Sequence, residues 1–304
     1  NARMRTIAVA VLAIIATAAE GAPGNSAWLA EAINSAKSGA VIDIPAGDYD
    51  LTDFKIYRSM TLKGAADGKT VLRSAAVTDK GVLVPLTGVD LRIENITFAG
   101  TKSWSRNGAG VRHEGRNLTV VNCRFIGNED GILSTGDRNG VITIERSLFR
   151  DNGFGDGQSH AIYVDGAALV DVKDSTFEST RIGHHLKSLA DRTVVRNTTF
   201  DDGHGRSSYA IDASRGGALI AENNFFVQAS DAENYSVINY DLTRGGSADG
   251  VTLTGNKVVN RFRGGVFLRN DTKVAPLMSA NEIENLGGKT MALTNPGSPI
   301  PRGE

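Results

Sequence analysis

Residues 120–132 read VVNCRFIGNEDGI, where an asparagine stands three residues before a phenylalanine and a polar turn leads into a new apolar run. The arrangement returns along the chain at intervals of 23–28 residues, at Phe98, Phe125, Phe149, Phe177, Phe200 and Phe226. Most of these follow an Asn or Asp by three residues, at Asn95, Asn122, Asp174, Asn197 and Asn223. Self-similarity at a period of roughly 20–50 residues indicates stacked supersecondary units. Because each unit holds two or three short β-type runs and little helix, the sequence predicts a parallel β-solenoid.

The strand that follows each phenylalanine sets a common register. We align these strands on one inward position, occupied by Val111, Ile132, Ile162, Leu186, Ile211, Val237 and Val266. Side chains alternate across a strand, so the next residues point outward: Arg112, Leu133, Tyr163, Lys187, Asp212, Ile238 and Phe267. Tyr163, Lys187 and Asp212 are then predicted to form an exposed ladder on consecutive coils, about 4.8 Å apart.

A second column stands two residues before the inward position. It contains Asp130, His160, His184, Tyr209 and Tyr235. Strict alternation points this column inward. It follows directly on a turn, however, so an outward direction stays open.

The charge balance and composition narrow the class of protein. The chain has 304 residues with 33 basic and 34 acidic side chains, which argues against nucleic acid or a membrane surface bound through bulk charge. Its 35 glycines and 6% aromatic content suit a turn-rich β protein. Since the repeat runs through almost the whole length, we predict one elongated domain over residues 19–295 and expect a monomer.

The N-terminus has the three parts of a secretory signal: basic Arg3 and Arg5, the apolar run 7–16, and the small residues 16–18. We therefore predict a signal peptide over residues 1–18, with an ordinary buried or capping helix as the alternative. The single Cys123 cannot form an internal disulfide and is expected to be a buried small residue. Export without disulfides indicates a secreted or periplasmic bacterial protein.

The segments at the two ends of the predicted solenoid differ from the repeat. Residues 26–37 carry apolar side chains at helical spacing, with Gly39 after their end, and we expect this helix to cover the open edge of the first coil. Residues 296–304 have no periodicity and are expected to be a loose tail.

Three segments carry a family resemblance: VIDIPAGDYDL at 41–51, MTLKGAADGKTVLRS at 60–74, and coils of the VVNCRFIGNEDGI type. They resemble secreted right-handed parallel β-helix proteins of the pectate-lyase-like superfamily, over roughly residues 25–295. The resemblance implies an all-β right-handed parallel β-helix with an N-terminal capping helix. It does not imply one activity, because the fold hosts lyases, hydrolases, epimerases and phage adhesins.

The chemistry we favour from the ladder is β-elimination on an acidic, uronate-containing polysaccharide. That reaction needs a group to neutralise the uronate carboxylate, a base for the C5 proton and an acid for the leaving oxygen. Lys187 is predicted to be the base if its pKa is lowered, or the counter-ion if it is not. Tyr163 or Tyr209 would donate to the leaving oxygen. His160 and His184 are competing bases.

Further residues are predicted to bind the glycan. Three long turns, 101–108, 150–159 and 201–208, are expected to overhang one edge of the solenoid, and Trp104 and Arg106 lie in the first of them. The aromatic contacts would come from Trp104 and several tyrosines. The predicted substrate-binding residues are Asp212, His185, Arg112, Arg181, Arg206, His204 and Tyr240.

Lyases of this fold that resemble chondroitinase B use a Lys and an Arg on neighbouring coils, often with calcium. Only Lys187 matches that pattern, and in type alone. No acidic cluster marks a calcium site. We therefore predict no metal ligands, and calcium is the one cofactor that the resemblance leaves open.

Two other functions stay open at this point. A hydrolase needs two suitably separated carboxylates, for which Asp165 and Asp212 are available. The run DDGHG at 201–205 resembles motifs of polygalacturonase-like hydrolases, but in that family the elements stand on separate coils. A non-catalytic carbohydrate-binding or adhesin module is the third possibility. Lys187 and Asp212 would then be only a surface ion pair.

Overall fold

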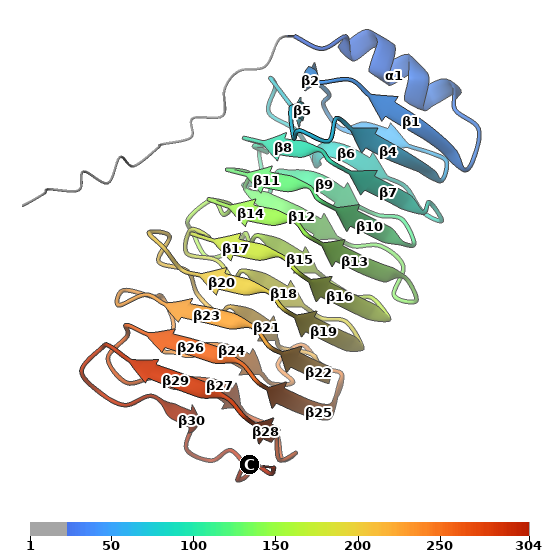
Figure 1. The fold of residues 1–304 in the computed structure, drawn as a ribbon. Coiled ribbons are helices and arrows are strands. Elements are labelled where there is room, and N and C mark those ends of the chain that lie inside the picture. Colours follow the sequence, from blue (N-terminus) through green and yellow to red (C-terminus); the bar gives the residue numbers. More distant parts are fainter. Residues whose placement is uncertain (1–22, 304) are drawn as a thin grey trace, which may run out of the picture.

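The computed structural model describes residues 23–303 and shows a right-handed solenoid of ten coils (Figure 1). The predicted signal peptide lies outside the described residues. The predicted fold is confirmed: one helix, α1 (Ser26–Ser35), precedes three parallel sheets, and each sheet has ten strands in sequence order. No helix within residues 23–303 is long and apolar enough to cross a membrane.

Each coil contributes one strand to each sheet. The first sheet consists of β1 (Ala40–Ile44), β4 (Met60–Gly64), β7 (Leu91–Glu94), β10 (Leu118–Val121), β13 (Val141–Glu145), β16 (Leu169–Lys173), β19 (Arg192–Arg196), β22 (Gly216–Glu222), β25 (Ser247–Thr254) and β28 (Leu277–Ser279). The second sheet consists of β2 (Gly47–Asp50), β5 (Thr70–Arg73), β8 (Thr97–Ala99), β11 (Arg124–Ile126), β14 (Leu148–Arg150), β17 (Thr176–Glu178), β20 (Thr199–Asp201), β23 (Phe225–Gln228), β26 (Lys257–Asn260) and β29 (Glu282–Asn285). The third sheet consists of β3 (Phe54–Ile56), β6 (Gly81–Pro85), β9 (Ala109–His113), β12 (Asp130–Ser134), β15 (Ile162–Val164), β18 (Leu186–Ser188), β21 (Ile211–Ala213), β24 (Ser236–Tyr240), β27 (Val266–Asn270) and β30 (Ala292–Thr294).

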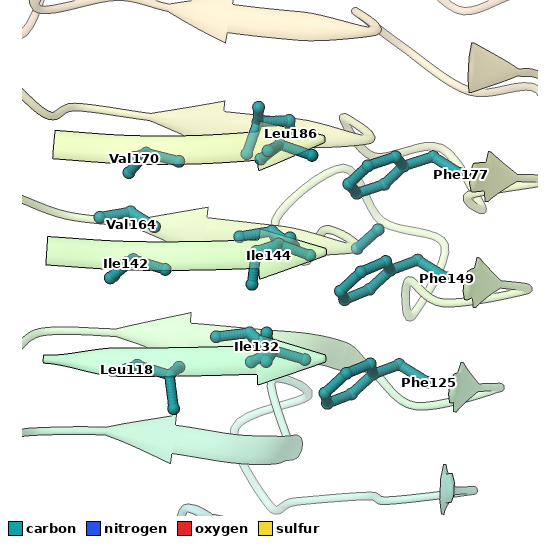
Figure 2. Close-up of a cluster of buried hydrophobic side chains, with 14 of the residues drawn as sticks. Leu118, Phe125, Ile132, Ile142, Ile144, Phe149, Val164, Val170, Phe177 and Leu186 are labelled. Atoms are coloured by element: carbon teal, nitrogen blue, oxygen red, sulfur yellow. The ribbon is translucent and has the colours of Figure 1, made fainter. Parts of the chain in front are cut away.

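The recurring phenylalanines lie on the second sheet and fill the interior. Their rings stack from Phe98 to Phe226 with centroids 4.7–5.1 Å apart and planes within 12° of parallel. This spacing is that of neighbouring strands, so one ring per coil closes the stack without gaps. Figure 2 shows Phe125, Phe149 and Phe177 one above another, beside aliphatic side chains of the facing sheets.

The residue three places before each phenylalanine, Asn or Asp in all coils but that of Phe149, lies in the turn between the first and second sheets. Asn95, Asn122 and Asn197 have φ of 57°, 50° and 49°, a left-handed conformation that Asn tolerates better than most residues. The Asn122 side chain also donates to Asn95 Oδ1 at 2.8 Å. A side-chain hydrogen bond therefore links the asparagines of these two neighbouring coils.

The two ends differ in how they are closed. Leu29 and Ile33 of α1 are buried against the first coil, and the Asn25 side chain caps the helix by accepting from Trp28 N at 2.8 Å. At the other end the expected loose tail is held to the last coil. Met278 N donates to Arg302 O, and Arg302 N donates to Pro276 O, both at 2.8 Å.

The predicted register holds through β21 and then fails. Ile211 pairs with Ile238, and Ile238 pairs with Leu268, so Val237 and Val266 were wrong choices for the inward position. Both strands have apolar residues at adjacent positions, and a period-2 pattern cannot then select the register. The outward neighbours of Asp212 are consequently Asn239 and Arg269, and not Ile238 and Phe267.

Candidate functional site

A row of polar side chains runs along the outer face of the third sheet, and we call it the outer ladder. Strand pairing places Tyr163 beside Lys187 and Lys187 beside Asp212, as predicted. It then continues the row through Asn239 to Arg269. The outer ladder therefore spans five consecutive coils, from β15 to β27.

The amine of Lys187 is partly desolvated. The residue is 9% exposed, and its Nζ lies 4.8 Å from the centroid of the Tyr163 ring. Burial lowers the pKa of Lys187, while the neighbouring Asp212 carboxylate partly opposes that shift. Within residues 23–303 no hydrogen bond or ion pair engages this Nζ.

Three of the five residues of the second predicted column are stacked rings, which we call the ring column: His160, His184 and Tyr209. Neighbouring centroids are 4.7 Å and 4.9 Å apart. His160 Nδ1 accepts from His184 N at 3.0 Å, and His184 Nδ1 accepts from Tyr209 N at 3.2 Å. Because each Nδ1 is an acceptor, a neutral imidazole here carries its proton on Nε2.

The ring column and the outer ladder meet side by side. The His160 ring contacts the Tyr163 ring edge-on, with centroids 5.7 Å apart, and His184 Nε2 lies 3.5 Å from Asp212 Oδ2. Burial, with the positive charge of Lys187, lowers the pKa of His160 to about 3. Burial also holds the pKa of His184 well below its usual value. Both rings are therefore neutral and weakly basic, so Lys187 is the better base of the two kinds.

The Asp212 carboxylate is held in place from several sides. Its Oδ1 accepts from Asn239 Nδ2 at 2.8 Å, and its Oδ2 accepts from Ser214 Oγ at 3.2 Å. Burial raises the pKa of Asp212, and the Asn239 hydrogen bond and Lys187 oppose that rise. Arg269 in turn donates to Asn239 Oδ1 at 2.8 Å and pairs with Asp271. Asp212, Asn239 and Arg269 therefore form a connected polar network, in which Lys187 makes no hydrogen bond.

Sequence reasoning missed Asn239, Arg269 and Arg244. The first two follow from the register error. A shared signal was present, since each strand reads apolar, polar, any residue, then Ser or Asp, at 211–214, 238–241 and 268–271. Arg244 is exposed and lies on the turn after β24. The Arg244 backbone N–H donates to Ser214 O at 2.8 Å. Burial lowers the pKa of Lys187, and the charge of Arg244 lowers it further. Burial raises the pKa of Tyr163, and the charge of Arg244 opposes that rise.

Two predicted binding residues are buried in the interior, and those predictions were wrong. His185 is fully buried, with Nδ1 2.7 Å from Thr180 Oγ1 and Nε2 3.0 Å from Asp202 Oδ1. It precedes β18, so strand alternation does not set its direction, and its ring lies beside the interior Phe177 and Phe200. Tyr240 is also fully buried, and its hydroxyl donates to Gly217 O at 2.6 Å. It shares the inward face with Ile238, two residues earlier.

The remaining predicted binding residues lie away from Lys187. Arg112 occupies the ladder position two coils before Tyr163, with Leu133 between them. Arg181 and Arg206 are exposed on turns between the second and third sheets, and Arg206 pairs with Glu233 at 3.2 Å. His204 is exposed, with Nε2 2.9 Å from Asp151 Oδ1. These four residues stay predictions as substrate contacts.

The described residues do not fit a calcium site at the outer ladder. No group of three or more His, Cys, Asp or Glu side chains between residues 23 and 303 is arranged to hold a metal ion. Calcium prefers several converging oxygen ligands, whereas the Asp212 oxygens already accept from Asn239 and Ser214.

The side chains of the outer ladder are more covered than predicted: Lys187 is 9% exposed and Asp212 3%, so the prediction of an exposed ladder was wrong for both. A cavity of about 380 Å³ lies on the first sheet near the C-terminus, lined by Ile220, Val274 and Leu277 among others. It contains none of the predicted catalytic residues. The ladder nevertheless extends along the axis of the solenoid over five coils, from β15 to β27.

The fold and this polar face define an all-β right-handed parallel solenoid with a row of ionisable side chains on one outer face. A family model described as the right-handed beta helix region matches residues 65–183 and 130–302, so the chain belongs to that family. No curated protein matches the sequence.

Two solved structures illustrate the similarity in fold. A mutant of AlyGC, a PL6 family alginate lyase, is 15% identical with a TM-score of 0.54, and the match covers 93% of this chain and 39% of AlyGC. An alginate lyase from Paenibacillus sp. str. FPU-7 is 16% identical with the same TM-score of 0.54, over 90% of this chain and 98% of that one. These neighbours are polysaccharide lyases. At this identity the likeness shows the fold alone.

Proposed function

We propose that the protein is a polysaccharide lyase that cleaves an acidic, uronate-containing glycan by β-elimination on the outer face of the third sheet. The observation that carries the proposal is the Lys187 amine, which is partly desolvated, lies over Tyr163 and beside Asp212, and has no hydrogen-bond partner among residues 23–303. The alginate lyases of similar fold make alginate the first substrate to test.

Each requirement of β-elimination has a candidate group. The exposed Arg244 guanidinium neutralises the uronate carboxylate, which makes the C5 proton more acidic. Neutral Lys187 removes that proton. The electron pair of the C5–H bond forms the C4–C5 double bond as the C4–O bond breaks.

Tyr163 then supplies the proton to the leaving oxygen. Burial and the nearby Asp165 raise the pKa of Tyr163, so its hydroxyl is protonated near neutral pH. This hydroxyl donates to Asp165 Oδ1 at 3.2 Å in the free protein. After the reaction the Lys187 ammonium and the Tyr163 phenolate are neighbours, and proton return between them restores both groups. Tyr209, half-buried at the end of the ring column, is the alternative donor.

The histidines have a positioning role in this scheme. His160 supports the Tyr163 ring edge-on, and His184 presents its Nε2–H toward Asp212. Because the proposed substrate is a polymer, we also propose that the protein acts after export, in line with the predicted signal peptide at residues 1–18.

One assay separates the lyase from its alternatives. The protein is incubated with alginate and with other uronate polymers, and the ultraviolet absorbance of the unsaturated product is followed. We expect Lys187→Met to lower the rate by about 100-fold or more, as expected for loss of a general base. Lys173→Met is the control, because Lys173 is an exposed lysine of the first sheet paired with Glu145. New reducing ends without the absorbance would show a hydrolase, and retention on the glycan without either signal would show a binding module.

A metal-removal arm belongs to the same assay. Because no oxygen ligands converge at the outer ladder in the described residues, we expect treatment with a chelator to leave the rate unchanged. A loss of activity that calcium restores would contradict this part of the proposal.

A further inference from the structure

We infer that the turn 101–108 and the turn 150–159 together form a second glycan-binding site, in which the Trp104 indole stacks on a sugar ring of the bound polymer and Arg106 contacts its carboxylate. We call Trp104, Arg106 and Phe154 the aromatic platform. This inference rests on the proposed function and adds to it a binding site remote from the reacting sugar.

The aromatic platform lies in line with the ring column. The turn 101–108 leads into β9, whose first residue, Ala109, is the register partner of Asp130. Asp130 Oδ1 accepts from His160 N at 2.7 Å, so the same row continues into the ring column. The turn 150–159 leads directly into His160. Ala109, Asp130 and His160 are themselves buried, so the polymer lies on the outer ladder beside this row. There it passes the two turns that lead into the row.

Contacts between the two turns join the platform across coils. The Arg106 guanidinium carbon lies 4.9 Å from the centroid of the Phe154 ring. A guanidinium stacked on a ring keeps its N–H groups free at the edge of the plane. Arg106 can thus support Phe154 and donate to a carboxylate at the same time.

The turn that presents Trp104 is held rigidly, although the indole itself is 78% exposed. The buried Glu129 accepts from Ser103 N and from Gly108 N through one oxygen, both at 2.8 Å. Arg106 N donates to Ser103 O at 3.1 Å, and Arg106 has a left-handed φ of 60°. A buried carboxylate at the base of a turn fixes its tip before any ligand arrives, which reduces the entropy cost of binding.

The charges of the platform favour an acidic ligand. Lys102 and Arg106 are exposed on one turn, and Asp156 is the exposed carboxylate of the other. The exposed charges are thus two cations and one anion, whereas the carboxylates of Glu129 and Asp151 are engaged by the turn backbone and by His204. An exposed indole beside that charge fits a uronate ring, which has apolar C–H faces and one carboxylate.

The distance along the solenoid sets the length of substrate that reaches both sites. Three coil steps separate β9 from β18, which carries Lys187, and they amount to about 14 Å at the interstrand spacing. If one sugar covers roughly one coil, since both repeats are on the order of 5 Å, an oligosaccharide of two or three units on Lys187 does not reach Trp104. Longer chains do.

Tryptophan fluorescence gives a direct test, because the chain has only two tryptophans. The variant Trp28→Phe leaves Trp104 as the single tryptophan, and Lys187→Met in the same chain prevents turnover. We expect titration with alginate to change the emission of this variant until it saturates. The matched variant Trp104→Phe with Lys187→Met retains Trp28 on α1 and should show no change.

Kinetics provide the second readout. We expect Trp104→Ala to raise KM for polymeric alginate about three- to tenfold, as loss of one aromatic stacking contact predicts, with kcat unchanged. Its KM for short oligosaccharides should equal that of the parent protein. Trp28→Ala should leave both values unchanged.

The outcomes separate this inference from the proposed function. Unsaturated product formed with unaltered KM by Trp104→Ala, together with constant Trp104 emission, overturns the aromatic platform and leaves the lyase standing. Saturable Trp104 emission without any unsaturated product overturns the lyase and retains the platform as a glycan-binding site. Absence of both signals with every uronate polymer tested overturns both.

Discussion

At the scale of single residues, burial decides which group is the base. His160 and His184 have ordinary pKa values suited to neutral pH, but desolvation lowers the first to about 3 and the second well below its usual value. The same desolvation acts usefully on Lys187, whose ordinary pKa of 10.5 is too high for a base near neutrality. One effect thus weakens the histidines and activates the lysine.

The neighbours of Lys187 predict how the pH profile of activity responds to mutation. Lys187 must be neutral to act as a base, so activity should rise with pH through its lowered pKa. Asp212 raises that pKa and Arg244 lowers it. We expect Asp212→Asn to move the rising limb of kcat/KM to lower pH and Arg244→Gln to move it to higher pH.

Opposite shifts in these two variants are the distinguishing result. A merely structural role of either residue would lower the amplitude of the profile without moving its limb. If the rising limb moved in the same direction in both variants, the assignment of Lys187 as the base would be contradicted.

At the scale of elements, contacts between side chains at equal positions of neighbouring coils stabilise each coil. The phenylalanine stack supplies the apolar contact, and left-handed Asn residues turn the chain from the first sheet into the second. Both features are local in the sequence, so the repeat revealed them. The turns that lead into the third sheet vary in length, and the direction of the ring column depends on them.

Two adjacent phenylalanines of β23 give a matched test of the stack. Phe226 is 1% exposed within the stack, whereas Phe225 is 37% exposed on the outer face. We expect Phe226→Ala to lower the free energy of unfolding by about 3–5 kcal/mol, since it removes a large buried ring and leaves a cavity. Phe225→Ala should lower it by less than about 1 kcal/mol.

Denaturant unfolding monitored by circular dichroism measures both values. Equal losses for the two variants would mean that the ring stack contributes no more to stability than the surface does.

At the scale of the whole molecule, burial of neutral histidines links folding to pH. The pKa of His113 is lowered by burial to about 4 and that of His160 to about 3, from an ordinary value of 6.5 in the unfolded chain. At a pH between the lowered pKa of the folded protein and 6.5, the unfolded chain binds more protons than the folded protein. Stability should therefore fall as the pH drops below about 6.5, by up to about 1.4 kcal/mol per pH unit for each such histidine.

Buried carboxylates act in the opposite sense. Burial raises the pKa values of Asp130, Asp202 and Asp212, so the folded protein takes up these protons first and gains stability as the pH falls. Only a variant isolates the contribution of one histidine. His160→Asn keeps a side-chain acceptor for His184 N and removes the titrating ring.

We expect the free energy of unfolding of His160→Asn to fall less steeply with decreasing pH than that of the parent protein between about pH 6 and pH 4. The difference in slope should correspond to close to one bound proton. Free energies of unfolding measured at several pH values determine the slope. His204→Asn, at an exposed ring outside the ring column, is the control for removal of an imidazole. An unchanged slope in His160→Asn would show that His160 does not stay neutral in the folded protein.

The sequence by itself determined the solenoid and the adjacency of Tyr163, Lys187 and Asp212. Residues at equal positions of a repeat must stack at the strand spacing, so periodicity alone brings them together. It also indicated the capping helix, because amphipathic spacing is a local pattern.

Only the tertiary structure decided which side chains of that face are accessible. Strand pairing and turns of unequal length decided the burial of His185 and Tyr240 and the place of Arg269 at the end of the outer ladder. They also decided that the charge of Arg244 acts on the pKa of Lys187. Where apolar residues stand next to each other in a strand, alternation no longer selects the face. Contacts between coils then choose the register, and those contacts exist only once the chain is coiled.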